Sequence, residues 1–223
     1  MLNDAIVNVN GDSVQILDVT LLLVTITLLP TLVVMMTSFT RYVVSLSFLR
    51  TAMGTQQNPP NMVLVGMALI LTLFSMTPTL DDIKADAFDP YTAGEITQEE
   101  FFDRAQVPLK EYMLNQTEIP SMELYCNMTN TPVPQSQDEA RDLPMRVIMP
   151  AYVTTELKTA FSIGFLLYIP FLLIDIIVSS TLMSMGMVML PPAMISTPFK
   201  ILLFIMLDGW PLLFETLVQG IRY

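Results

Sequence analysis

Five charged residues lie inside or beside long apolar runs in the second half of the chain: Lys158, Asp175, Lys200, Asp208 and Glu215. Charged side chains are rare in membrane-spanning segments, where they face a bundle interior or a water-filled cavity. On one continuous helix, Asp208 and Glu215 would fall within about 80° of Lys200. Such a stripe could relay protons or ions, or it could form ion pairs between helices or between subunits. We favour ion pairing, because the sequence contains no histidine.

A methionine-rich run, LMSMGMVMLPP, occupies residues 182–192. It contains four alternating methionines and one valine: Met183, Met185, Met187, Val188 and Met189. An extended run would place all four methionines on one face, whereas a helix would divide them between two faces. Gly186 and the Pro191–Pro192 pair predict that a regular helix ends here. Methionine is flexible, so a ring of these side chains from several subunits could seal a pore. The alternative is an ordinary methionine-rich helix end.

Residues for most other chemistries are missing from the sequence. Cys126 is the only cysteine, which excludes an intrachain disulfide and a cysteine-based zinc site. No Gly-rich phosphate loop, GxSxG or HExxH motif occurs. The net charge of −11 argues against nucleic-acid binding. We therefore expect no enzymatic activity, no cofactor, no metal and no nucleic-acid partner.

The elements that carry these residues are long hydrophobic runs. Hydrophobic residues make up 52% of the chain and charged residues 14%, with a mean hydropathy of +0.56, whereas soluble domains contain about 25% charged residues. Roughly 20 apolar residues in a helix cross a bilayer core. The sequence predicts an all-α, membrane-type fold with four hydrophobic helical segments: 19–40, 51–80, 159–199 interrupted by Asp175, and 201–221 interrupted by Asp208 and Glu215.

Residues 81–146 differ from these runs. They contain 14 acidic and 5 basic residues, and stretches such as ITQEEFFDRAQVPLKEYMLNQ have helical apolar spacing. We expect a small acidic helical insert with one mobile loop. The predicted organisation is an N-terminal segment (1–18), a first hydrophobic hairpin (19–80), the insert (81–146), and a second hydrophobic hairpin with the methionine-rich loop (147–223).

The orientation follows from basic residues in short connections. Arg41 and Arg50 lie between the first two hydrophobic segments, and Lys200 lies between the last two. Basic short connections mark the cytoplasmic side of a membrane. The insert and both termini are therefore expected outside the cytoplasm. Residues 1–18 lack the basic start of a signal peptide.

Four long blocks carry a family resemblance: MMTSFTRYVVSLSFLRTAMGTQQNPPN (35–61), PAYVTTELKTAFSIGFLLYIPFLLIDIIVSS (150–180), LMSMGMVMLPPAMISTPFK (182–200) and LFIMLDGWPLL (203–213). These blocks resemble the FliP family of flagellar biosynthesis proteins. The resemblance covers nearly the whole chain except the N-terminus and the insert. MTSFTR and GTQQxPPN are more similar to the flagellar branch than to the virulence-injectisome branch.

The resemblance implies a core subunit of the flagellar type III protein export gate. Proteins of this family form a helical, closed-ended oligomer, pentameric in this subunit, with FliQ and FliR in the bacterial inner membrane at the flagellar basal body. FlhA and FlhB would be further partners, and unfolded flagellar subunits would be the cargo. The hydrophobic helices would form bent hairpins largely lifted out of the bilayer, and the insert would meet the rod.

The resemblance also implies that the methionine-rich loop is a gasket around the pore. Met187 and Met189 match that motif, and Val188 stands where a third methionine is usual. Three alternatives remain open at this point: an injectisome export gate subunit, a proton-coupled transporter that uses Asp175, Asp208 and Glu215, and a receptor or adaptor whose insert binds a partner.

Overall fold

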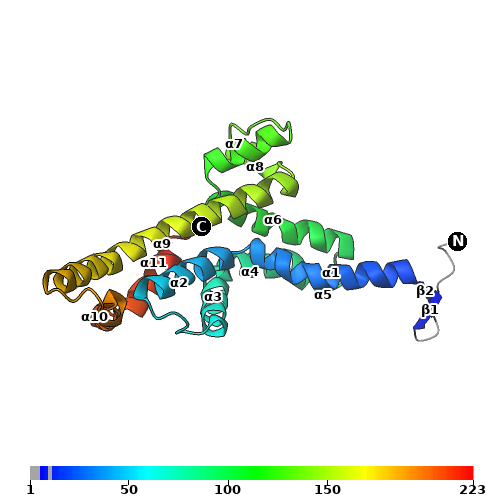
Figure 1. Cartoon of the computed structure of the whole chain (residues 1–223). Coiled ribbons are helices and arrows are strands. Elements are labelled where there is room, and N and C mark those ends of the chain that lie inside the picture. Colours follow the sequence, from blue (N-terminus) through cyan, green and yellow to red (C-terminus); the bar gives the residue numbers. More distant parts are fainter. Residues whose placement is uncertain (1–5, 10–11, 223) are drawn as a thin grey trace.

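The computed structural model describes residues 6–9 and 12–222. The all-α class is confirmed apart from one short antiparallel hairpin, formed by β1 (Ile6–Val9) and β2 (Asp12–Gln15) with Val7 opposite Val14. The hairpin lies in the N-terminal segment, for which the sequence predicted no element. Figure 1 shows it at one end of an elongated molecule.

The first two helices are α1 (Ile16–Met35) and α2 (Phe39–Met53). In Figure 1 they follow one another in nearly the same direction, so the chain does not reverse between them. The reversal comes after α2, where Gly54 adopts a left-handed φ of 73° and its N–H donates to the carbonyl of Thr51. The sequence placed Arg41 and Arg50 together in one turn, but they lie near opposite ends of α2, about 14 Å apart along the axis.

A bent helical run follows this turn and leads into the insert. It begins at Asn61, directly after Pro60, and bends by 59° after Ser75. The bend separates an apolar helix from shorter acidic pieces. The elements are α3 (Asn61–Ser75), α4 (Thr77–Ile83), the π-helix η1 (Lys84–Phe88) and α5 (Asp89–Thr92).

The rest of the insert is helical, as the sequence predicted. Its main helix, α6 (Gln98–Gln116), starts with a capping box, in which the Thr97 hydroxyl accepts from the N–H of Glu100 and the Glu100 carboxylate accepts from the N–H of Thr97. Two shorter helices follow, α7 (Ile119–Met128) and α8 (Gln137–Arg141).

The second hydrophobic half contains one helix much longer than expected. α9 (Met145–Ser184) has 40 residues, about 60 Å at 1.5 Å per residue, and continues unbroken through Asp175. The sequence treated Asp175 as an interruption, but a charged side chain does not end a helix when it finds a polar partner. α10 (Pro192–Met206) and α11 (Gly209–Gln219) then form a pair bent by 67°.

Among the described residues, α9 is long and apolar enough to cross a membrane alone. Two bent pairs pass the same criterion jointly: α3 with the helices from Thr77 to Thr92, and α10 with α11. The structure thus has a membrane-type helix and bent helical pairs, while the four-segment topology stays a prediction.

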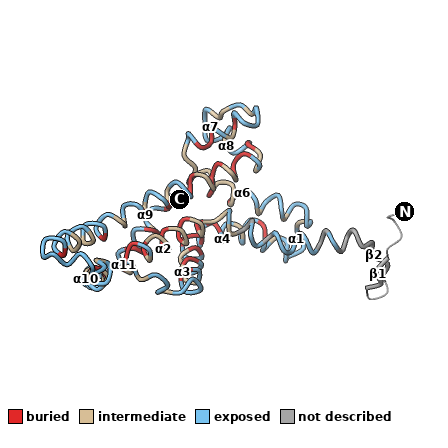
Figure 2. The backbone as a smooth tube through the Cα atoms, in the orientation of Figure 1, coloured by how far each residue is buried: buried red, intermediate tan, exposed pale blue. Residues whose placement is uncertain are grey.

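The core lies where α2, α6 and α7 pack on the first half of α9 and where α3 packs on α2, as the buried segments in Figure 2 show. Tyr42 and Leu46 of α2 and Tyr152 of α9 are fully buried there. α2 and α9 approach closely, because Gly164 leaves room for the ring of Phe48. The far half of α9 and most of α10 are exposed in the single chain (Figure 2).

Candidate functional site

The methionine-rich turn (185–191) joins α9 to α10. α9 ends at Ser184 and α10 begins at Pro192, so the predicted helix stop is found. Gly186 makes the turn possible with a left-handed φ of 76°, which L side chains rarely adopt. The turn is closed by two backbone bonds, from the N–H of Gly186 to the carbonyl of Met183 and from the N–H of Met187 to the carbonyl of Leu182.

The side chains of this turn point largely into open space. Met183 belongs to the last turn of α9, whereas the other methionines follow in the turn, so the run is neither one helix nor one extended strand. Met189 is 98% exposed and Val188 81%, although both are apolar. Beside the turn, α9 and α10 form an apolar groove of about 400 Å³ that includes Ile177 and Phe199. Exposed apolar surface of this extent marks an interaction site.

Asp175 and Lys200 form an ion pair between α9 and α10. The Lys200 ammonium lies 2.6 Å from the Asp175 carboxylate and also donates to the carbonyl of Ala52 at 3.0 Å. Lys200 is buried, whereas the Asp175 side chain is one-third exposed. One ammonium therefore connects α2, α9 and α10.

The other three predicted charges lie apart from this pair. Lys158 pairs with Glu118 of the insert at 2.5 Å on an exposed surface. Asp208 is exposed at the bend between α10 and α11, and Glu215 accepts a hydrogen bond from Gln219 of its own helix. A single stripe of Lys200, Asp208 and Glu215 required one continuous helix, and the 67° bend interrupts that helix. The five charges are therefore not brought together.

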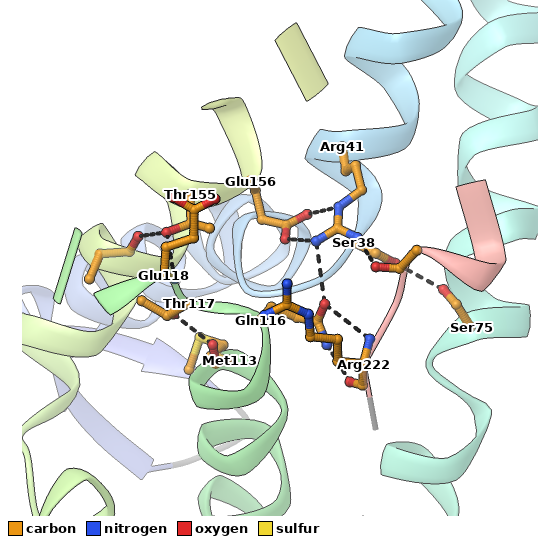
Figure 3. A network of polar contacts seen from close by, with 12 residues as sticks. Ser38, Arg41, Ser75, Met113, Gln116, Thr117, Glu118, Thr155, Glu156 and Arg222 are labelled. Atoms are coloured by element: carbon orange, nitrogen blue, oxygen red, sulfur yellow. Dashed lines mark hydrogen bonds and ion pairs between the residues drawn. The ribbon is translucent and has the colours of Figure 1, made fainter. Parts of the chain in front are cut away.

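A buried network centred on Arg41 was missed by the sequence interpretation (Figure 3). Arg41 is 3% exposed and Glu156 fully buried, and the guanidinium Nε donates to the Glu156 carboxylate at 2.9 Å while Nη2 contacts the other carboxylate oxygen. Nη2 also donates to Gln116 at 3.3 Å, and Nη1 donates to the carbonyl of Gly220 at 2.9 Å. Arg41 therefore connects α2 with α6, α9 and the segment after α11.

This network bears on the membrane orientation that was inferred from Arg41. Arg41 was assigned to the cytoplasmic side and the insert to the opposite side, yet Arg41 donates to Gln116 of the insert. Arg41 and this end of the insert therefore lie side by side, so the two assignments do not both hold, and the orientation stays a prediction. A buried partner could have been suspected from Glu156, which lies in the largely apolar stretch PAYVTTELKTAF.

The described residues contain no group of three or more His, Cys, Asp or Glu side chains placed to hold a metal ion. A cavity of about 580 Å³ lies in the insert between α6, α7 and α8. Arg141 and Glu111, which are paired at 3.1 Å, line it together with Arg222.

The chain is similar to known proteins over most of its length. The model of the FliP family matches residues 22–217. The flagellar biosynthetic protein FliP of Aquifex aeolicus (strain VF5) is 46% identical over 209 residues, which cover 94% of this chain and 86% of that protein. That of Bacillus subtilis (strain 168) is 47% identical over 200 residues, 90% of this chain and 89% of the relative. That of Pectobacterium carotovorum subsp. carotovorum is 47% identical over 199 residues, 89% of this chain and 76% of the relative. With these matches, the exposed methionine-rich turn and the bent apolar helices lead to one assignment: the chain belongs to the FliP family of flagellar biosynthetic proteins.

Proposed function

We propose that this chain is a core subunit of the flagellar type III protein export gate in the bacterial inner membrane, at the flagellar basal body. In this proposal, several copies, five by the family pattern, assemble with FliQ and FliR around a channel. FlhA and FlhB act on the same gate, and unfolded flagellar subunits pass through it. Membership in a family of flagellar biosynthetic proteins supports this function.

The observation that carries the proposal is the exposed methionine-rich turn at the end of α9. Met189 and Val188 have almost no cover in the single chain. Leaving such apolar side chains in water is unfavourable, so we infer that other subunits cover them or that they meet one another around the pore. Several turns in a ring would bring flexible thioether side chains together at one constriction, where they exclude water and ions at rest.

The same side chains explain how a constriction yields to cargo. Methionine has three rotatable side-chain bonds and adapts to irregular surfaces at low cost. A passing unfolded chain would therefore displace the side chains of Met187 and Met189 without breaking hydrogen bonds. In this function the chain performs no covalent step, and the energy for transport comes from partner proteins.

The main competing function is proton-coupled transport. A relay requires carboxylates that exchange protons with water along a path. Asp175 is held by Lys200, whereas Asp208 lies at the bend and Glu215 bonds within its own helix. This separation disfavours a relay. An injectisome role is disfavoured because the relatives named above are flagellar proteins.

The test is assembly with the predicted partners. The chain would be co-expressed with FliQ and FliR from the same genome, purified in detergent and weighed intact by native mass spectrometry. We expect a complex that holds several copies of this chain. A monomer or dimer that excludes both partners would overturn the proposal. The same genes should restore motility to a strain that lacks its own FliP-family subunit.

A further inference from the structure

We propose that the segment Gly220–Arg222, called the strap, is a releasable latch that ties the end of α10 and α11, together called the arm, to α2 and α6. The arm begins at the methionine-rich turn, so its position sets one side of that turn. The latch itself depends only on contacts within this chain. Its consequence for a pore rests on the proposed function.

The arm has little apolar burial of its own. Ser196 and Lys200 are the only buried residues of α10, and both are polar. α11 buries Gly209, Leu213 and Leu217. An element with few buried apolar contacts opens locally at low free energy compared with global unfolding. α10 is therefore attached without a buried apolar side chain, whereas α11 also packs Leu213 and Leu217 into the core.

The strap supplies one polar anchor for the arm (Figure 3). The Gln116 side chain binds the backbone of Arg222 twice, because Nε2 donates to its carbonyl and Oε1 accepts from its N–H at 3.3 Å. Arg41 donates to the carbonyl of Gly220 at 2.9 Å, and Ile221 between them is buried. Paired backbone contacts of this kind fix a segment much as an added strand does, but with side-chain donors and acceptors.

The second anchor is Lys200, near the middle of α10, which donates to Asp175 and to the carbonyl of Ala52. Between the two anchors lies the 67° bend, where Asp208 adopts a left-handed φ of 48°. The arm is thus a jointed pair of helices, held at α10 by an ion pair and after α11 by the strap.

Release of the strap does not leave a buried charge without a partner. When Gly220 leaves, Arg41 keeps both contacts to the Glu156 carboxylate, so the buried guanidinium remains paired. The groups that lose partners are the backbone groups of Gly220 and Arg222 and, on the other side, Arg41 Nη1 and the Gln116 amide, and water replaces these hydrogen bonds once the strap has moved away. Arg222 is exposed and lines the cavity of about 580 Å³ in the insert, so the strap is accessible from outside. Release of the strap is therefore reversible, whereas loss of the Arg41–Glu156 pair would leave two buried charges unpaired.

The first measurement is hydrogen–deuterium exchange, followed by mass spectrometry, on the purified full chain in detergent. Gln116→Met removes every strap bond made by Gln116 and keeps a side chain of similar length. The matched control is Asn115→Met, which places the same side chain at the neighbouring exposed position. We expect amides of residues 209–222 to exchange about tenfold faster or more in Gln116→Met than in the wild type and Asn115→Met. Amides in the cores of α2 and α9 should be unchanged.

Two outcomes would overturn the latch: no local change in Gln116→Met, or an equal rise along the whole chain, which would make the strap an ordinary part of the core. Ile221→Ala provides a second route if Gln116→Met does not fold. It removes buried strap surface without touching the polar network and should release the same residues.

The consequence for the gate is tested separately, in a strain that lacks its own subunit. If the wild-type chain restores motility, Gln116→Met should raise the resting ion leak severalfold over Asn115→Met. Faster exchange in the arm with no added leak would show that the strap does not restrain the turn. Failure of the wild type to restore motility would count against the proposed function and leave the exchange result standing.

Discussion

Arg41 and Glu156 lie 115 positions apart in the chain and form a buried ion pair between α2 and α9, with Arg41 Nε donating to Glu156 Oε2 at 2.9 Å. The same guanidinium also binds Gln116 and Gly220. Taking two charges out of water is costly, and the cost is recovered only when further hydrogen bonds satisfy the remaining donors. Arg41 meets that condition with four donated bonds to three partners.

Removal of one member of this pair should be far more harmful than removal of both. Arg41→Met or Glu156→Met alone leaves a buried unpaired charge, and we expect a loss of about 3–5 kcal/mol in unfolding free energy. The double variant should recover part of that loss. Thermal or denaturant unfolding in detergent measures all three.

The matched control for this pair is Lys158→Met, which breaks the exposed pair with Glu118. Exposed ion pairs contribute about 0–1 kcal/mol, so this variant should unfold almost like the wild type. If Arg41→Met cost no more than Lys158→Met, the network would not stabilise the core.

Tyr112 makes the stability of the core depend on pH in the alkaline range. Burial, followed by the nearby negative charge of Glu156, raises the pKa of Tyr112 from 10.0 to about 12. The folded state then holds a proton that the unfolded state releases above pH 10. Stability from this group is complete below pH 10 and is lost as the pH rises toward 12, by about 1.4 kcal/mol per pKa unit. Tyr112→Phe should show a shallower decline over pH 10–12, and equal slopes would contradict the prediction.

Two glycines should respond in opposite ways to the same substitution. A Cβ on Gly164 would lie 2.4 Å from the Phe48 ring, so Gly164→Ala should force α2 and α9 apart and cost about 1–3 kcal/mol. A Cβ on Gly66 in α3 meets nothing within 4 Å, so Gly66→Ala should stabilise the helix by about 0.5–1 kcal/mol. Unfolding of the two variants side by side tests the close approach, and a neutral Gly164→Ala would argue against it.

Asp175 distinguishes packing from proton transport. Asp175→Asn leaves the buried Lys200 with a weaker partner, and we expect a loss of about 1–3 kcal/mol and reduced assembly with FliQ and FliR. Asp208→Asn at the exposed bend should stay within about 0.5 kcal/mol of the wild type. A fully assembled, stable Asp175→Asn complex with no export would instead favour the transporter alternative.

The methionine-rich turn should control leak without controlling folding. Met187→Ala with Met189→Ala removes exposed side chains, so the unfolding free energy should change by less than about 0.5 kcal/mol. Small-ion permeability of the opened gate should increase, because the constriction loses its flexible side chains. Met206→Ala, at the far end of α10, is the control. Unchanged leak in the double variant would exclude the gasket.

Local patterns determined most of the helices. The apolar spacing of residues 96–116 predicts α6, and Gly186 with the Pro191–Pro192 pair predicts the break between α9 and α10. These signals work from sequence because each depends on residues that are close together in the chain. The family could also be identified from sequence, because its blocks are long and contiguous.

Only the tertiary structure determined which charges that are distant in the sequence contact one another. From sequence, Arg41 was assigned to a cytoplasmic turn and Asp175 to an interruption, and Glu156 drew no attention. The fold brings Arg41 to Glu156 and Asp175 to Lys200, so that one charge is paired inside the core and the other lies within an unbroken helix. The amino-acid type shows that a charge in an apolar run needs a partner. Which partner it finds depends on how α2, α9 and α10 pack, and no local pattern encodes that packing.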